Sequence, residues 1–217
     1  MTKRVSFSNL EGELAEPAGS DKAPSVVLIQ EWWGVNDHIK SLVDRLSKEG
    51  FLVIAPDLYH GRTTKDAGEA TKWMNELDTL AAVKEIGAAV AYLKEHPRSN
   101  GKVGVTGFCL GGALTLASAC HVSGLSAAVS FYGLPPAEKV DYAKATIPVE
   151  MHVGKKDGWV TPDKAEAVKK QMKDATVYVY DADHAFVNDT RPEVYDEKNA
   201  KLAWDRMVAF FKKHLSS

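Results

Sequence analysis

Six short apolar runs, separated by longer stretches with helical periodicity, most constrain the fold of this chain. The runs cover residues 25–30, 52–55, 102–106, 127–131, 147–153 and 176–180. Continuous apolar runs of this length are typical of strands buried on both faces of a parallel sheet. Helical stretches occupy residues 37–49, 66–95, 111–121, 162–173 and 192–214, with a break expected near residue 78. This alternation predicts an α/β fold with a mostly parallel central sheet and helices on both faces.

Residues at the ends of these stretches carry ordinary capping signals. Asp37 is predicted to cap the first long helix, and Thr161 followed by Pro162 predicts the start of another. No repeat, low-complexity segment or linker interrupts the pattern. At 217 residues, 45% of them hydrophobic, the chain is long enough for one buried core and short for two. We therefore expect residues 1–217 to form a single domain.

The net charge of −2 provides no basic field that would hold nucleic acid or an anionic membrane. The N-terminal segment lacks the apolar stretch of a signal peptide, and no run reaches the length of a membrane span. We expect a soluble, cytoplasmic protein that acts as a monomer. The two cysteines and seven histidines show no metal-binding spacing, so neither a metal nor another cofactor is expected.

A glycine-rich segment, Gly107-Phe108-Cys109-Leu110-Gly111-Gly112, lies between a predicted strand and a predicted helix. It matches the nucleophile elbow of α/β-hydrolases, with cysteine in place of serine. The turn is so tight that glycine must flank the nucleophile, because a side chain would collide with neighbouring backbone. Cys109 is thus a candidate nucleophile, and the positive end of the following helix is expected to lower the thiol pKa below its free value of about 8.5.

One other interpretation of this segment stays open. The glycines could belong to an ordinary turn, with Cys109 a small buried hydrophobic residue. The spacing of the glycines does not fit a dinucleotide-binding fingerprint. Cys120 lies inside an apolar helical run and is interpreted as part of the core.

The partners of such a nucleophile follow it along the chain, first an acid and then a histidine, from the ends of later strands. Asp157 lies in the loop after the run at 147–153, although beside Gly158 it could also be a simple turn residue. His184 lies just after the last strand and before the terminal helix. The other histidines fit helix ends, a strand or positions before the cysteine. We expect His184 to keep Cys109 anionic and Asp157 to orient the imidazole, so that the thiolate attacks an ester carbonyl.

The segment Gln30-Glu31-Trp32-Trp33-Gly34 follows the first long strand. In this fold that region supplies one backbone donor of the oxyanion hole, so the amides of Trp32 and Leu110 are the candidate donors. Glu31 is unusual there, because a carboxylate at the end of a buried strand is costly unless it is partnered. It could be a loop residue, or it could take the thiol proton when substrate binds, in which case the resting enzyme need not hold a thiolate.

Together, Glu31 before an aromatic residue, the cysteine elbow, Asp157 and His184 resemble the dienelactone hydrolase (carboxymethylenebutenolidase) family. The resemblance extends over nearly the whole chain and includes Ala55-Pro56-Asp57-Leu58-Tyr59 and Phe131-Tyr132-Gly133. It implies an α/β-hydrolase fold and a Cys-His-Asp triad switched on by Glu31. It also implies hydrolysis of dienelactone (4-carboxymethylenebut-2-en-4-olide) to maleylacetate, a step in the breakdown of chlorinated aromatics.

Arginines hold the substrate carboxylate in that family, and here the chain departs from the pattern. Arg62 can supply the first, although the segment before it is one residue longer than expected. Asn188 stands at the second position, with Arg191 nearby as a substitute or as the cap of a helix. An amide does not reproduce bidentate recognition of a carboxylate, so the preferred acid or ester could differ.

Three functional hypotheses follow. The leading one is a lactone or ester hydrolase of dienelactone type. The second is a broader carboxylesterase or thioesterase acting on small esters, suggested by Asn188. The third, of a different class, is a non-catalytic protein of the same fold that binds ligands or senses thiol chemistry through Cys109.

Overall fold

The fold is built around one mixed β-sheet. The computed structural model describes residues 1–136 and 139–216, and within them the sheet has eight strands in the order β1-β2-β4-β3-β5-β6-β7-β8. The strands are β1 Lys3–Phe7, β2 Leu10–Ala15, β3 Ala23–Ile29, β4 Leu52–Pro56, β5 Ser99–Phe108, β6 Leu125–Phe131, β7 Val149–Gly154 and β8 Ala175–Tyr180. β3 to β8 pair in parallel, whereas β1 and β2 are antiparallel. The predicted mostly parallel sheet is confirmed.

The N-terminal hairpin of β1 and β2 was not predicted from the sequence. Its strands are short and carry charged residues on their exposed positions, so neither forms a continuous apolar run. Ser8 and Asn9 close the hairpin with positive φ angles of 46° and 64°, which a two-residue turn between twisted antiparallel strands requires. The hairpin pairs with β4 and forms one edge of the sheet.

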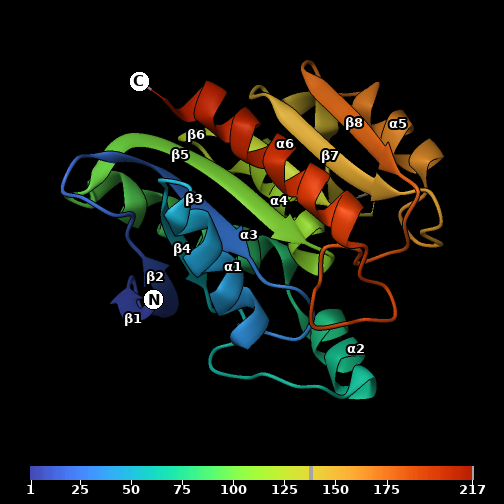
Figure 1. Ribbon diagram of the computed structural model, residues 1–217, viewed down its shortest axis with the longest axis horizontal. Helices are drawn as coiled ribbons and strands as arrows, with labels where there is room; N and C mark the ends of the chain where they lie inside the picture. Colours follow the sequence, from blue (N-terminus) through green and yellow to red (C-terminus); the bar gives the residue numbers. More distant parts are fainter. Residues whose placement is uncertain (137–138, 217) are drawn as a thin grey trace.

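Helices cover both faces of the sheet (Figure 1). They are α1 Asp37–Lys48, α2 Ala67–Glu76, α3 Thr79–Glu95, α4 Leu110–His121, α5 Pro162–Lys169 and α6 Glu197–Leu215, with a short 3₁₀ helix η2 at Tyr142–Lys144. α1 and α6 pack on one face, and α3, α4 and α5 pack on the other. The predicted break near residue 78 is present between α2 and α3.

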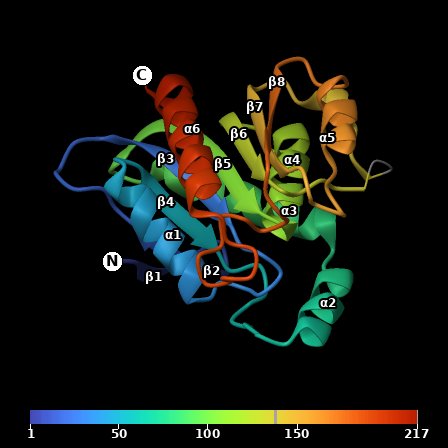
Figure 2. The ribbon, with the colours of Figure 1, turned by 45° about the vertical axis from the view of Figure 1, so that its right-hand side comes forward.

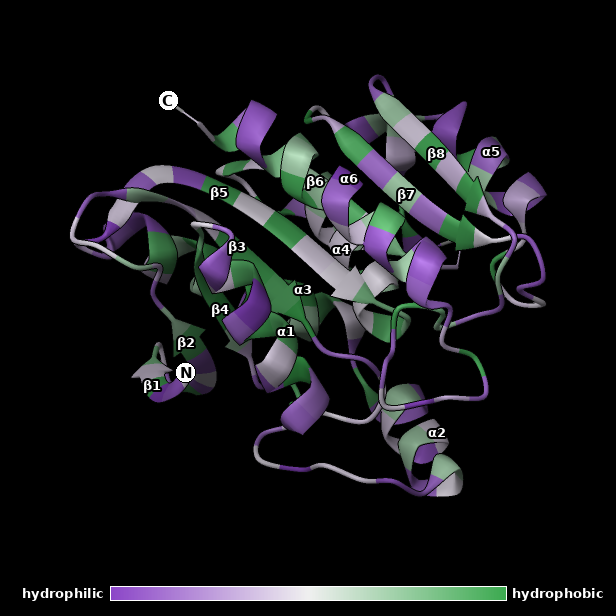
Figure 3. Cartoon of the chain, viewed as in Figure 1, coloured by the Kyte–Doolittle hydropathy of each residue, from purple (hydrophilic) through white to green (hydrophobic). Residues whose placement is uncertain are grey.

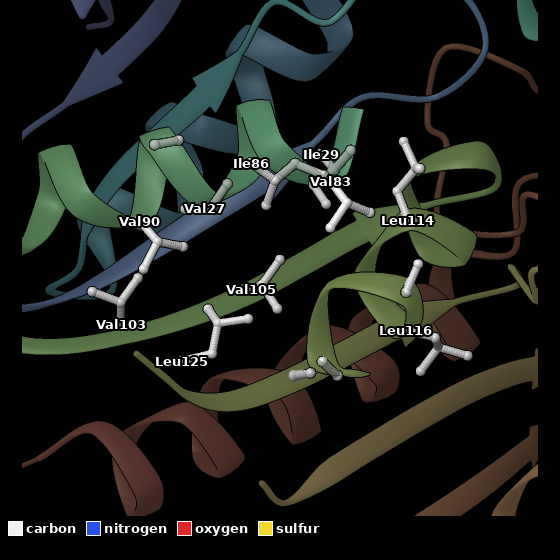
Figure 4. Close-up of a cluster of buried hydrophobic side chains, with 14 of the residues drawn as sticks. Val27, Ile29, Val83, Ile86, Val90, Val103, Val105, Leu114, Leu116 and Leu125 are labelled. Atoms are coloured by element: carbon white, nitrogen blue, oxygen red, sulfur yellow. The ribbon is translucent and has the colours of Figure 1, made fainter. Parts of the chain in front are cut away.

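The two faces of β3 show how the core divides. Val26 and Leu28 pack in the cluster under α1 and α6, while Val27 and Ile29 pack in the cluster under α3 and α4. Figure 4 shows the second cluster, with Val83 of α3 directed at the sheet. Figure 3 shows mostly hydrophobic residues along β3 and β4 and alternating colours along α6, which has one face in the core. Burial on both sides explains the continuous apolar character of the central strands.

One predicted capping residue and one predicted helix start differ from the structure. Asn36, not Asp37, caps α1, because its side chain accepts the amide hydrogen of Ile39 at 3.1 Å. α6 begins at Glu197 instead of near residue 192, since the Asp196 side chain accepts the amide hydrogen of Asn199 at 2.9 Å. In both cases a neighbouring residue with the extended backbone of a cap satisfies the first free amides.

α2 stands off the sheet, and Ala70 is its one buried residue among those described (Figure 2). Its C-terminal end and the turn into α3 therefore leave space between this helix and α4. No helix within residues 1–136 and 139–216 is long and apolar enough to cross a membrane.

Candidate active site

The carboxyl ends of the parallel strands bring the predicted site residues to one edge of the sheet, where ligands bind in folds of this kind. Successive strands β3, β5, β6, β7 and β8 are followed by Glu31, Cys109, Tyr132, Asp157 and His184. A cleft of about 440 Å³ opens there, lined by Cys109, Tyr132 and His184 together with residues of the α2–α3 turn and α4. Among the residues predicted from the sequence, Cys109, His184, Trp32 and Leu110 thus line one cavity.

Cys109 occupies a sharp turn between β5 and α4 with φ 56° and ψ −114°. Its amide donates to the carbonyl of Phe131 at 3.0 Å. A Cβ added to Gly107 would lie 2.3 Å from the carbonyl oxygen of Gly111, and one added to Gly111 would lie 2.4 Å from that of Ile29. The backbone can therefore make this turn only with glycine on both sides of the cysteine.

Asp157 and His184 form a short hydrogen bond, with Nδ1 of His184 2.6 Å from Oδ2 of Asp157. The other carboxylate oxygen accepts the amide hydrogens of Trp159 at 2.8 Å and Val160 at 2.9 Å. Burial raises the pKa of Asp157, but these hydrogen bonds outweigh it, and the pKa lies below its ordinary value. An ionised Asp157 holds the ring with Nδ1 protonated, which leaves Nε2 as the basic nitrogen.

Nε2 of His184 is buried and has no hydrogen-bond partner among the described residues. Cys109 and His184 both line the cleft, but the thiol is not hydrogen-bonded to the imidazole here. The nitrogen that would accept a proton in catalysis is therefore free in this structure.

Glu31 is 2% exposed and accepts a hydrogen bond from Nδ2 of Asn188 at 2.7 Å. Oδ1 of Asn188 in turn accepts the amide hydrogen of Thr190 at 3.0 Å and its hydroxyl hydrogen at 2.6 Å. Burial raises the pKa of Glu31 to about 7, against the opposing effect of the Asn188 hydrogen bond. The carboxyl can therefore exchange a proton near neutral pH.

Burial, together with the nearby Glu31 and Asp157 carboxylates, raises the pKa of the Cys109 thiol to about 12. The prediction that the helix end lowers this pKa below its free value is therefore wrong. The amide of Leu110 at the start of α4 does donate to the sulfur and favours the thiolate. One backbone donor does not offset desolvation and negative neighbours in a buried site.

The two candidate oxyanion donors belong to residues on opposite sides of the nucleophile. Trp32 and Leu110 both line the cleft, Trp32 from the loop after β3 and Leu110 from the first turn of α4. The Trp32 ring packs edge-on against Trp33, with centroids 4.9 Å apart. Their amides stay the predicted oxyanion donors.

The three predicted substrate-binding residues do not line the cleft. The Arg62 guanidinium lies 4.9 Å from the Trp73 ring centroid, and its Nε donates to the Tyr59 carbonyl at 3.2 Å. Arg62 instead lines a separate cavity of about 240 Å³. Nε of Arg191 donates to Glu193 at 2.8 Å, and the amide of Asn188 holds Glu31.

The sequence model of the Dienelactone hydrolase family matches residues 10–215 of this chain. The chain belongs to the dienelactone hydrolase family. The chain is similar to "Protein usf" of Aquifex pyrophilus, with 38% identity over 95% of this chain and 94% of that protein. It is also similar to "Putative carboxymethylenebutenolidase" of Aquifex aeolicus, with 35% identity over 95% of this chain and 94% of that protein. Because the family consists of hydrolases, hydrolysis of an ester or lactone bond is the reaction that the site has to explain.

A solved structure shows the same architecture. The "Putative Dienelactone Hydrolase from Klebsiella pneumoniae" superimposes with a TM-score of 0.89 at 29% identity, covering 98% of each chain. The α/β-hydrolase fold expected for a dienelactone hydrolase family member is thereby confirmed.

Tyr132 is a cleft residue to which sequence reasoning assigned no role. It follows β6 with φ 37°, is 1% exposed, and its ring centroid lies 5.1 Å from that of His184. Its hydroxyl is buried without a hydrogen-bond partner among the described residues. The only signal was its place in the Phe131-Tyr132-Gly133 segment after a strand, because nothing in the local pattern distinguishes a tyrosine in the core from one facing a cleft.

Within residues 1–136 and 139–216, no group of three or more His, Cys, Asp or Glu side chains is placed so that it could bind a metal ion.

Proposed function

We propose that this chain hydrolyses lactone or carboxylic ester bonds through an acyl-enzyme on Cys109. The observation that carries the proposal is the 2.6 Å hydrogen bond between Asp157 and His184, with the free Nε2 of His184 beside the cleft that Cys109 lines. A base oriented by a carboxylate, near a nucleophile on a strained turn, is the arrangement that acyl transfer needs.

The reaction starts from a thiol, because the pKa of Cys109 is about 12. Glu31, with a pKa of about 7, accepts the thiol proton when substrate arrives and passes it to Nε2 of His184, which then holds the proton that the leaving group needs. The thiolate attacks the carbonyl carbon, and the amides of Trp32 and Leu110 stabilise the negative oxygen of the tetrahedral intermediate.

The C–O bond then breaks, and His184 protonates the departing alkoxide, which stays attached to the acyl group if the substrate is a lactone. Water adds to the thioester as His184 accepts one of its protons. The tetrahedral intermediate releases the carboxylic acid, and the thiol regains its proton. Asp157 keeps the imidazole in the required tautomer throughout and is not itself protonated.

Dienelactone and small uncharged esters are both substrates for this mechanism. Dienelactone is the one that the family resemblance implies, with maleylacetate as the product. The third hypothesis, a binding or thiol-sensing protein, would use the same cysteine without turnover.

Purified protein incubated with dienelactone or 4-nitrophenyl acetate tests the proposal. We expect release of acid, with a covalent acyl adduct on Cys109 visible by mass spectrometry under single-turnover conditions. Cys109→Ala should lower kcat by about 10³-fold or more. Cys120→Ala is the matched control, because Cys120 is a half-buried cysteine near the other end of α4, and it should keep its activity. Ligand binding without turnover in the unaltered protein would favour the sensing hypothesis and contradict the proposal.

A further inference from the structure

We propose that the cleft selects substrates whose acyl group is uncharged and apolar, and that it disfavours an acyl group carrying a carboxylate. This inference rests on the proposed function and specifies its substrate class. Three independent features of the described residues support it: the walls of the cleft, the charges that face it, and the places where the arginines are held.

Apolar side chains from three elements form the walls. Leu77 comes from the α2–α3 turn, Leu114 from α4, and Leu134 and Pro135 from the loop after β6. Trp159, 68% exposed, stands on the far side with its ring perpendicular to that of His184 and centroids 4.9 Å apart. Such walls favour hydrocarbon chains and flat rings and offer few partners to an ionised group.

The charges around the nucleophile are mostly negative. Glu31 and Asp157 both act on the Cys109 sulfur and raise its pKa, whereas Arg191 is the one positive side chain that lowers it. The reaction adds a thiolate to these negative charges. Among the described lining residues Lys139 is the one lysine or arginine, and its side chain is exposed. A substrate carboxylate entering this site would face like charges near the nucleophile, with only the solvent-exposed Lys139 among the described lining residues to pair with it.

The arginines that could supply such a cation are held elsewhere. Arg62 stacks on Trp73 in the neighbouring cavity, which also contains the carboxylates of Glu76 and Glu85. Arg191 is close enough to lower the pKa of Glu31, but its guanidinium is paired with Glu193 and does not line the cleft. Arg191 is thus paired with a carboxylate, and Arg62 is held by the Trp73 ring and the Tyr59 carbonyl.

A matched pair of esters tests the inference. 4-Nitrophenyl pentanoate and mono-4-nitrophenyl glutarate have five-carbon acyl chains that differ at the far end, a methyl group against a carboxylate. Rates measured with Cys109→Ala are subtracted, because the glutarate carboxylate also accelerates uncatalysed hydrolysis. We expect kcat/KM for the pentanoate to exceed that for the glutarate by about tenfold or more. Dienelactone should likewise be hydrolysed more slowly than its methyl ester.

Three variants connect this ratio to the cleft. Asn75 is an exposed cleft residue on α2, so its replacement removes no core packing. Asn75→Arg should reduce the ratio several-fold through better use of the glutarate, whereas Asn75→Gln should leave it unchanged. Arg191→Gln should also leave the ratio unchanged, since Arg191 is not used to bind substrate.

The results that would contradict the inference can be told apart from those that would contradict the proposed function. A glutarate rate equal to or above the pentanoate rate would overturn the inference while the proposed function stands. A selective loss of the glutarate rate in Arg191→Gln would also overturn it, because Arg191 would then be a carboxylate receptor. If neither ester nor dienelactone is hydrolysed, the proposed function fails, and the inference fails with it.

Discussion

Asn188 donates a hydrogen bond to Glu31 over 2.7 Å and thereby connects the loop after β8 to the end of β3. The residue at which an arginine was expected from the family pattern is thus an internal partner of the buried carboxyl. Its Oδ1 accepts hydrogen bonds from the amide and the hydroxyl of Thr190, so both ends of the side-chain amide have partners within the protein. In this chain Asn188 therefore holds Glu31 in place from within the protein.

Replacing Asn188 by alanine should therefore affect both stability and the titration of Glu31. The variant leaves the carboxyl and the Thr190 hydroxyl without a partner, and we expect a loss of about 1–3 kcal/mol in the free energy of unfolding. Because the hydrogen bond lowers the pKa of Glu31, its removal should raise that pKa further above 7. Urea unfolding at several pH values measures both effects. Thr190→Val removes one hydrogen bond and should cost less; an equal cost in the two variants would contradict this role of Asn188.

Glu31→Gln should stabilise the protein at alkaline pH. The folded-state pKa of about 7 is raised above the unfolded value near 4.5, so the folded form binds more protons between these values, and stability falls as pH rises from about 4.5 to 7. Gln removes that cost, which is about 3 kcal/mol above pH 7 and small at pH 5.

Thermal unfolding of Glu31→Gln at pH 8 and pH 5 checks this sign. About 2 to 4 °C in Tm is expected for each kcal/mol in a chain of this length, with most of the gain at pH 8. The exposed Glu76→Gln is the control and should show no pH-dependent gain. A Tm increase of the same size at both pH values would show that ionisation of Glu31 is not the cause.

The thiol of Cys109 should react slowly with iodoacetamide at neutral pH. With a pKa of about 12 instead of about 8.5, its thiolate fraction is about 10³-fold lower than that of a free cysteine. A Cys120→Ala background leaves a single cysteine for the measurement. Glu31→Gln in that background should accelerate alkylation several-fold, because the negative neighbour that raises the thiol pKa is gone. Rapid alkylation of the parent at pH 7 would show that the resting cysteine is already a thiolate.

Gly107→Ala should destabilise the protein by several kcal/mol, because its Cβ would overlap the carbonyl of Gly111 at 2.3 Å and force the elbow to move. Activity should fall with it, since the turn sets the position of Cys109. Gly158→Ala is the matched control: a Cβ there meets nothing within 4 Å, although this glycine is next to Asp157. Urea midpoints compare the two, and similar stability in both variants would mean that the elbow adapts easily.

Much of this protein follows from local pattern. The six central strands and the helices between them could be predicted, because residues buried on both faces of a parallel sheet must be apolar without interruption. The order of Cys109, Asp157 and His184 along the chain placed all three at strand ends, and parallel strands bring their carboxyl ends to one edge. The N-terminal hairpin could not be recognised, since its short strands at the sheet edge contain charged residues and form no continuous apolar run.

Charge and contact at the site were decided by tertiary structure. The sequence indicated a helix end that would favour a thiolate at Cys109, but burial and the carboxyl of Glu31, far away in the chain, outweigh it. Whether Arg62 faces the cleft or stacks on Trp73 depends on how α2 is placed, which no local pattern encodes. The chain by itself determined which residues follow the strand ends. Their protonation and free partners depend on desolvation and distance, which exist only after distant segments pack together.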